Sequence, residues 1–174
     1  MQISTKNNIE KTNLFEAIEK QLIALDLNWT SQDRERPWGG FFVIDPQKTH
    51  TFLAQFFPNI LDETKDVAQL HISPKILIVA PHQRLSWQYH YRRSEIWKVI
   101  STNPVGVKTS LTDLEPESVV TLAENDIIKM QKGERHRLIG LEHWGIIAEI
   151  WQHSDHNHPS DENDIVRIQD DFGR

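Results

Sequence analysis

The N-terminal part of the chain carries apolar residues at the spacing of an amphipathic helix. Leu14, Ala17, Ile18 and Leu22 recur three or four positions apart, with charged and polar residues between them. In a helix this spacing places all four side chains on one face. We therefore predict a helix that ends near residues 26–28 and packs on the outside of the main body of the protein.

A short apolar run at residues 41–44 follows a turn-like segment and is typical of a strand. Asp45 and Pro46 then have the form of a helix start, with the aspartate as the cap and the proline in the first turn. Phenylalanine and leucine residues further along provide a buried face, so we expect a helical insertion near residues 46–58. The polar, mixed residues 59–70 predict a loop.

The second half of the chain consists of short β-rich segments separated by turn signals. These segments are 75–80, 84–90, 95–100, 105–109, 118–122, 126–130, 135–139 and 144–151. Short segments at this spacing, with no helix-length segment between them, indicate an antiparallel sandwich or barrel. We expect a mainly β domain over residues 36–174, preceded by a helical extension over 1–35 and ending in a polar, Asp-rich tail over 154–174.

Length and composition narrow the function classes. A chain of 174 residues favours one domain. Its net charge of -6, from 19 basic and 25 acidic residues, argues against general nucleic-acid binding, which needs a basic face. No apolar run reaches the length of a membrane span and the N-terminus lacks a signal-peptide pattern, so we expect a cytoplasmic protein. With nine histidines and no cysteine, any metal site must use histidine, carboxylate or amide ligands.

The segment 84–90 places several polar residues on one face. Alternate residues of a strand share a face, so Arg84, Ser86, Gln88 and His90 are expected to point the same way. A short turn after His90 would bring Glu95 beside them on the next strand. An amide oxygen, an imidazole nitrogen and a carboxylate would then share one wall.

A second histidine, His136, follows a tight turn about forty residues after Glu95. A sandwich fold can bring it opposite Gln88, His90 and Glu95. These four side chains suit one divalent ion, with zinc as the first choice and manganese, iron or nickel as alternatives. Such a site leaves positions open for the oxygens of a substrate. The competing interpretation is the solvent face of a strand and an ordinary polar histidine.

Four motifs in this order resemble those of the cupins, and most closely those of the type II mannose-6-phosphate isomerases. That branch also forms the C-terminal domain of enzymes joined to GDP-mannose pyrophosphorylase. The motifs are Arg-Pro-Trp-Gly at 36–39, Leu-Ser-x-Gln-x-His-x-x-Arg-x-Glu-x-Trp at 85–97, Gly-x-x-His-Arg-Leu at 133–138, and Glu-x-Asp-Ile-Val-Arg-x-x-Asp-x-Phe-Gly-Arg at 162–174. The sequence departs from the family pattern at three turn positions, where we expect altered turns and a retained site: His82, Thr102 and Gln131.

The resemblance implies a double-stranded β-helix, or jelly roll, with N-terminal helical decorations and without the nucleotidyltransferase half. It implies that Gln88, His90, Glu95 and His136 bind one divalent ion, and by analogy a homodimer. The implied activity is aldose–ketose isomerisation of a sugar phosphate, most closely the interconversion of mannose 6-phosphate and fructose 6-phosphate. Two alternatives stay open: an isomerase of another sugar phosphate such as a heptose phosphate, and a non-catalytic cupin that senses or carries a sugar.

A phosphorylated substrate requires cations, and the planar fork of arginine matches phosphate oxygens. Arg84 shares the predicted metal face, and Arg93 matches the arginine of the family motif. Lys132 and the terminal Arg174 are further candidates. The alternatives are that Arg93 only pairs with Glu95 and that Arg174 is a solvated terminus.

The catalytic base has two candidates. Glu149 is the ionisable residue of an otherwise apolar segment, and burial inside a barrel would raise its pKa into the range suited to proton transfer. Lys75 is the rival. A solvent-facing Glu149, or one paired with a lysine, is the alternative.

The tail contains residues that the resemblance does not explain. His153, His156 and His158 lie close together, and a polar loop is the favoured interpretation over a second metal site. If the tail closes over the mouth of the barrel, Arg167 becomes a residue of the pocket.

Overall fold

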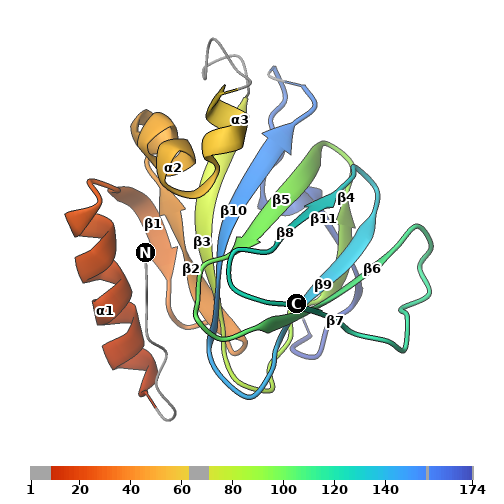
Figure 1. Ribbon diagram of the computed structural model, residues 1–174. Coiled ribbons are helices and arrows are strands. Elements are labelled where there is room, and N and C mark those ends of the chain that lie inside the picture. The colour runs from red at the N-terminus through yellow and green to blue at the C-terminus, as the bar shows by residue number, and fades with distance from the viewer. Residues whose placement is uncertain (1–8, 63–70, 156, 174) are drawn as a thin grey trace.

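A computed structural model describes residues 9–62, 71–155 and 157–173, and Figure 1 shows two antiparallel sheets with helices packed on one of them. The larger sheet has the strand order β1 (Trp29–Asp33), β2 (Gly39–Ile44), β3 (Ile72–Val79), β10 (Gly145–His153), β5 (Arg93–Val99) and β8 (Ile127–Met130). The smaller sheet has the order β11 (Ile165–Gln169), β4 (Trp87–His90), β9 (Arg135–Gly140), β6 (Val105–Ser110) and β7 (Val120–Leu122). The predicted mainly β fold with N-terminal helical decorations is confirmed.

The larger sheet is buried on both faces. Along β3, Ile76 and Ile78 belong to a core shared with the helices, whereas Leu77 and Val79 belong to a second core between the two sheets. The same alternation runs along β10 and β5, because successive side chains of a strand point to opposite faces. β10, which carries Glu149, is therefore apolar at most positions, because one face packs on the helices and the other faces the interior of the barrel.

The helices cover the outer face of the larger sheet. The predicted first helix is α1 (Lys11–Ala24), and four of its side chains are fully buried against that face: Leu14, Phe15, Ile18 and Leu22. The predicted helical insertion consists of a 3-10 turn (Pro46–Lys48) and α2 (Thr49–Phe56). No helix in the described residues is both long enough and apolar enough to cross a membrane.

Three elements lie where the sequence predicts no helix or strand: a short helix, β1 and β11. The segment expected to be a loop begins with the short helix α3 (Pro58–Asp62), while residues 63–70 lie outside the described residues. Within the predicted N-terminal extension, β1 adds a strand to the edge of the larger sheet by pairing with β2. The main sheet therefore begins before residue 36.

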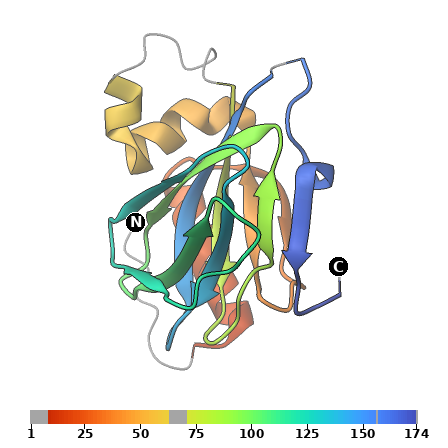
Figure 2. The same cartoon turned by 90° about the vertical axis from the view of Figure 1, so that its right-hand side faces the viewer.

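The C-terminal tail forms a strand of the barrel. After a 3-10 turn (Glu162–Asp164), β11 pairs antiparallel with β4 at the edge of the smaller sheet, as Figure 2 shows for the dark blue strand. Asp164 is buried and fastens this segment, because its carboxylate accepts the backbone N–H groups of Tyr91 and Arg92 and the hydroxyl of Ser160. The tail thus closes one side of the space between the sheets.

Candidate metal centre and cavity

A cavity lies between the two sheets. Its empty space, including the open mouth, is about 510 Å³. Aromatic side chains from the larger sheet and from the turn before β2 line it, together with four basic and three acidic residues. The charged residues of the lining are Arg36, Lys75, Arg93, Arg167, Glu95, Glu149 and Glu162.

Three predicted metal ligands converge in the interior. The Nε2 atoms of His90 and His136 lie 3.2 Å apart, and the two carboxylate oxygens of Glu95 lie 3.0 Å and 3.3 Å from them respectively. All three side chains are 98% buried. They come from β4, β5 and β9, so the site depends on both sheets.

The protonation pattern of the cluster suits a cation. The Nδ1 atom of His136 lies 3.0 Å from the carbonyl oxygen of Glu134, which can only accept, so Nε2 of the neutral ring carries a lone pair. The guanidinium of Arg93 donates to Nε2 of His90 at 3.1 Å, which likewise makes this atom an acceptor. Two lone pairs and a carboxylate thus face one another.

The spacing of these atoms also fits a metal ion. Ligand atoms about 2.1 Å from one zinc ion lie about 3.4 Å apart at a tetrahedral angle, close to the three separations seen here. The residues present therefore fit a divalent metal. A bound ion would compete with Arg93 for Glu95 and His90.

The local charges keep the ligands in their metal-binding forms. Burial lowers the pKa of His90 and so favours the neutral imidazole. Burial alone would raise the pKa of Glu95, but His90, Arg93 and His136 outweigh it and hold that pKa well below its usual value. Glu95 is accordingly ionised at neutral pH.

Gln88 lies on the same wall. Its Cα pairs with that of His136 in the register between β4 and β9, and its side chain lines the cavity. The hydroxyl of Ser86 donates to its amide oxygen at 2.6 Å. This oxygen retains a second lone pair, so Gln88 stays a predicted fourth ligand.

Arg93 is buried and fixed from several sides. It donates to Glu95 at 2.7 Å and to the hydroxyl of Ser160 at 2.8 Å, and its guanidinium lies 3.5 Å from the ring centroid of Trp151. Such a cation–π contact stabilises a charged side chain away from water. The structure thus shows the pair with Glu95 and brings Arg93 to the cavity, and phosphate binding by Arg93 stays a prediction.

Glu149 reaches the same cavity from β10. It is 3% exposed, and the indole N–H of Trp97 donates to it at 2.9 Å and to Glu95 at 3.1 Å. Burial, reinforced by the negative charge of Glu95, raises the pKa of Glu149 to about 8. The alternative of a solvent-facing Glu149 is wrong, and this carboxyl is poised to exchange a proton near neutral pH.

Lys75 is engaged as a cation. Its ammonium pairs with Glu162 at 3.0 Å and lies 3.3 Å from the ring centroid of Trp151. It also lies 5.3 Å from the ring centroid of Phe41. These contacts engage the ammonium group in the wall of the cavity, and a role of Lys75 as the base stays a prediction.

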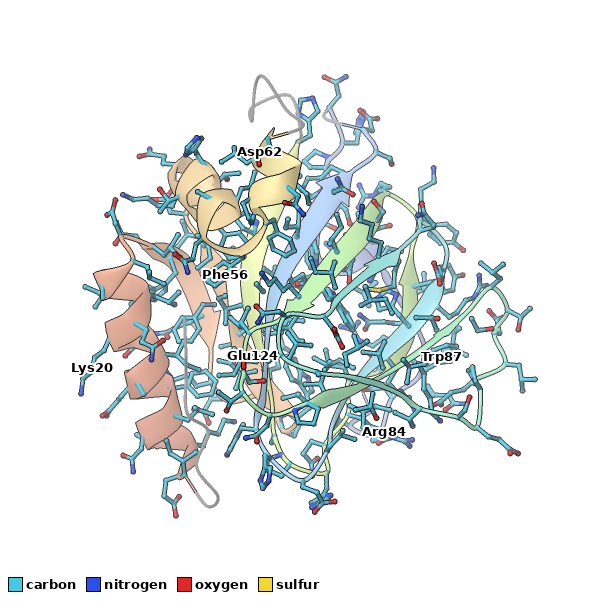
Figure 3. The ribbon with its side chains drawn as sticks, in the orientation of Figure 1. Lys20, Phe56, Asp62, Arg84, Trp87 and Glu124 are labelled. Carbon is cyan, nitrogen blue, oxygen red and sulfur yellow. The ribbon has the colours of Figure 1, made fainter. Side chains whose placement is uncertain are left out.

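Two predicted phosphate ligands, Arg84 and Lys132, are not brought to the cavity. Arg84 forms a bidentate pair with Asp171 at 2.6 Å and 3.0 Å, and Figure 3 shows it near the end of the barrel away from α2 and α3. Lys132 is exposed in a turn and does not line the cavity, and Arg174 lies outside the described residues.

The misplacement of Arg84 has a structural cause. Consecutive residues Leu85 and Ser86 both line the cavity, which a regular strand does not permit. β4 begins only at Trp87, and Arg84 makes an isolated bridge to Ile139. The alternation that links Gln88 to His90 therefore does not extend back to Arg84.

Two basic residues of the cavity come from the outer motifs. Arg167 lines it, as expected if the tail closes over the barrel mouth. Arg36 was not predicted, although it lies in the Arg-Pro-Trp-Gly motif. The position of Gly39 in that motif requires a glycine, because its φ is 141° and a Cβ would lie 1.9 Å from the carbonyl oxygen of Ile78.

The remaining predictions concern histidines. The ring of His153 is held by the hydroxyl of Ser73 at 2.8 Å and the backbone N–H of Ser160 at 3.0 Å, which is a structural role. His158 lies exposed beside an aspartate, and His156 lies outside the described residues. His82 has a φ of 57°, so it retains a conformation that usually favours glycine.

Comparisons with known proteins bear on the family and the fold of this chain. A family model described as mannose-6-phosphate isomerase C-terminal matches residues 59–170, more than half of the chain. A search of curated proteins gave no significant match.

Solved structures resemble the chain at low sequence identity. KdgF from Halomonas sp. is 10% identical with a TM-score of 0.50, over 76% of this chain and 89% of that one. Vicilin from Corylus avellana (hazelnut) is 12% identical with a TM-score of 0.50, over 75% of this chain and 34% of that one. A Cupin 2 conserved barrel domain protein from Salinispora arenicola CNS-205 is 16% identical with a TM-score of 0.39, over 47% of this chain and 63% of that one. The chain thus spans about a third of the hazelnut protein. At these identities, KdgF and vicilin bear on the fold alone.

Proposed function

We propose that this chain, which belongs to the family of mannose-6-phosphate isomerase C-terminal domains, is a metal-dependent aldose–ketose isomerase of a sugar phosphate. The substrate pair proposed is mannose 6-phosphate and fructose 6-phosphate. One observation carries the proposal: a buried His–Glu–His cluster reaches, through Glu95, the cavity that is also lined by Glu149, a carboxyl group with a pKa of about 8.

The cluster provides the electrostatic part of the chemistry. His90, Glu95 and His136, with Gln88 as a fourth ligand, would hold one divalent ion. When bound, this ion would supply a Lewis acid that stabilises negative charge developing on adjacent oxygens of the sugar. Zinc suits the two imidazoles and the carboxylate, and manganese, iron and nickel are the alternatives.

Glu149 provides the proton transfer. Moving a carbonyl group between two neighbouring carbons takes a proton from the carbon that becomes the carbonyl and adds one to the carbon that was the carbonyl, while a hydroxyl proton moves between the two oxygens. A carboxyl group with a pKa of about 8 gains and loses a proton readily near neutral pH. Trp97 fixes its orientation through the indole N–H, which holds the carboxyl group toward the cavity beside Glu95.

The other charged residues position and shield the reaction. Arg93 binds Glu95 and so limits the movement of a predicted metal ligand. Lys75 contributes a second cation in the same wall. Aromatic side chains around them exclude water, which strengthens electrostatic interactions inside the cavity.

The test is isomerase activity of the purified protein loaded with zinc or manganese. Mannose 6-phosphate in D₂O should be converted to fructose 6-phosphate with deuterium appearing at the carbons that exchange a proton, as read by NMR. His90→Ala should lose both the metal and the activity. His82→Ala is the matched control, because His82 is an exposed histidine outside the cluster.

Two results would contradict the proposal. Tight binding of sugar phosphates without turnover under any of the four metals would indicate a binding protein. Full activity of a chelator-treated protein, with metal absent by mass spectrometry, would remove the metal from the mechanism.

A further inference from the structure

The cavity carries more positive than negative side chains, in contrast to the protein as a whole. Four basic and three acidic residues line it, even when Glu149 is counted as ionised, whereas the net charge of the chain is -6. Arg93 with Glu95 and Lys75 with Glu162 form close ion pairs. A metal ion at the cluster would increase the positive excess.

Three basic side chains of the cavity come from three different parts of the fold. Arg36 comes from the connection between β1 and β2, Lys75 from β3 and Arg167 from β11. The guanidinium of Arg36 and the ammonium of Lys75 lie 5.7 Å and 5.3 Å from the same ring centroid, that of Phe41. Arg36 and Lys75, which are distant in the sequence, thus lie in one region of the wall, and Arg167 lines the same cavity from the tail strand.

A carboxylate of the tail already occupies this region. Glu162 accepts a hydrogen bond from Lys75 at 3.0 Å, and its side chain is 54% exposed. Burial would raise the pKa of Glu162, but Lys75, Arg93 and Arg36 outweigh it and lower that pKa. Lys75, Arg93 and Arg36 therefore act together on one anionic group.

We propose that Arg36, Lys75 and Arg167 form a subsite for the phosphate group of the substrate, and that Glu162 is an internal carboxylate which the phosphate displaces. This assignment rests on the proposed function and replaces Arg84 and Lys132 as phosphate ligands. It gives the phosphate end of the substrate a place in the cavity that Glu95 of the metal cluster and Glu149 also line.

The chemistry of the subsite favours phosphate over a carboxylate. Each guanidinium offers several N–H donors. In Arg36, the ion pair with Asp33 is made by Nε. A phosphate dianion offers three strongly accepting oxygens and twice the charge of Glu162. Glu162 is half exposed, so it can move into water when a dianion takes its place.

Isothermal titration with inorganic phosphate and with mannose 6-phosphate tests the subsite in the full chain. Arg36→Gln and Arg167→Gln should each weaken binding of both ligands about tenfold or more, the effect of losing a charge-assisted hydrogen bond. Glu162→Gln should tighten binding several-fold because it removes the competing charge. Arg84→Gln is the matched control, an arginine paired with the tail outside the cavity, and should leave binding unchanged.

The arginine variants should weaken phosphate binding and Glu162→Gln should strengthen it, and this difference separates a role in binding from a role in structure. If Glu162 only docked the tail, Glu162→Gln would weaken binding, and that result overturns the proposal. Unchanged binding in both Arg36→Gln and Arg167→Gln overturns it as well. Arg167→Lys keeps the charge and supports the assignment if it restores part of the affinity; thermal unfolding verifies that each variant is folded.

The subsite and the proposed function can fail separately. Phosphate binding that follows the predicted pattern, without turnover of any sugar phosphate, leaves the subsite standing and removes the isomerase. Turnover of mannose 6-phosphate with an unchanged KM in Arg36→Gln and Arg167→Gln leaves the isomerase standing and removes the subsite.

Discussion

Replacing Glu149 by glutamine removes an ionisable group from the cavity while keeping an oxygen for the indole N–H of Trp97. In the folded protein the pKa of Glu149 is about 8, compared with 4.5 for an ordinary glutamate. The folded state therefore holds a proton that the unfolded chain releases across this range. As a result, Glu149 lowers the free energy of unfolding progressively as the pH rises from about 4.5 to about 8.

The size of the effect follows from the two pKa values. Each tenfold change in proton affinity corresponds to about 1.4 kcal/mol, so the full penalty reaches roughly 5 kcal/mol at pH 8. Glu149→Gln escapes this penalty. Relative to the native protein, the variant should gain little at pH 5 and several kcal/mol at pH 8.

Urea unfolding of chelator-treated protein between pH 5 and pH 9 measures this difference. Metal must be absent, because a cation at the cluster offsets the charge of Glu95 that helps to raise the pKa of Glu149. Repeating the series with zinc should therefore flatten the pH dependence. Glu16→Gln, which removes an exposed carboxylate on α1, is the control and should show no such trend. A difference between Glu149→Gln and the native protein that stays constant from pH 5 to pH 8 would refute the reasoning.

Three further predictions address the metal, the helix and the tail. Zinc at about a hundred times its dissociation constant should raise the free energy of unfolding by about 2.7 kcal/mol, and calorimetry should find no such gain in His136→Ala. Phe15→Ala should cost about 3–5 kcal/mol in urea unfolding, because this ring is fully buried between α1 and the sheet; a cost below 1 kcal/mol would mean that α1 is dispensable. Asp164→Asn should cost about 1–3 kcal/mol and expose the tail to limited proteolysis, because one acceptor oxygen becomes a donor beside two backbone N–H groups; unchanged proteolysis would argue against this anchor.

The sequence predicts those elements whose side chains alternate or repeat strongly. The apolar face of α1 and the eight β-rich segments of the second half all correspond to elements of the structure. α3, β1 and β11 were missed. β1 is a mostly polar segment that gains its order by pairing with β2. The other two were missed for different reasons. α3 is only five residues long, whereas β11 is half-buried at a sheet edge and gains its order from backbone pairing with β4.

The same distinction applies to the candidate site. His90, Glu95 and His136 lie within regular strands, so parity and the motif together locate them, and the structure brings them within hydrogen-bonding distance. Arg84 lies before the regular part of β4, where parity no longer applies. Arg36 could not be assigned from local pattern, because its place in the cavity depends on how the turn before β2 meets the tail.

The two buried faces of β10 have a consequence for how the length of this chain can change. Ala148 packs toward the helices and the next residue, Glu149, faces the cavity. Inserting or deleting one residue within β10 would exchange these environments, so that the carboxyl group would point into the apolar interface with the helices and a methyl group would face the cavity. Natural insertions should therefore accumulate in connections such as residues 111–119, while the length of β10 stays fixed.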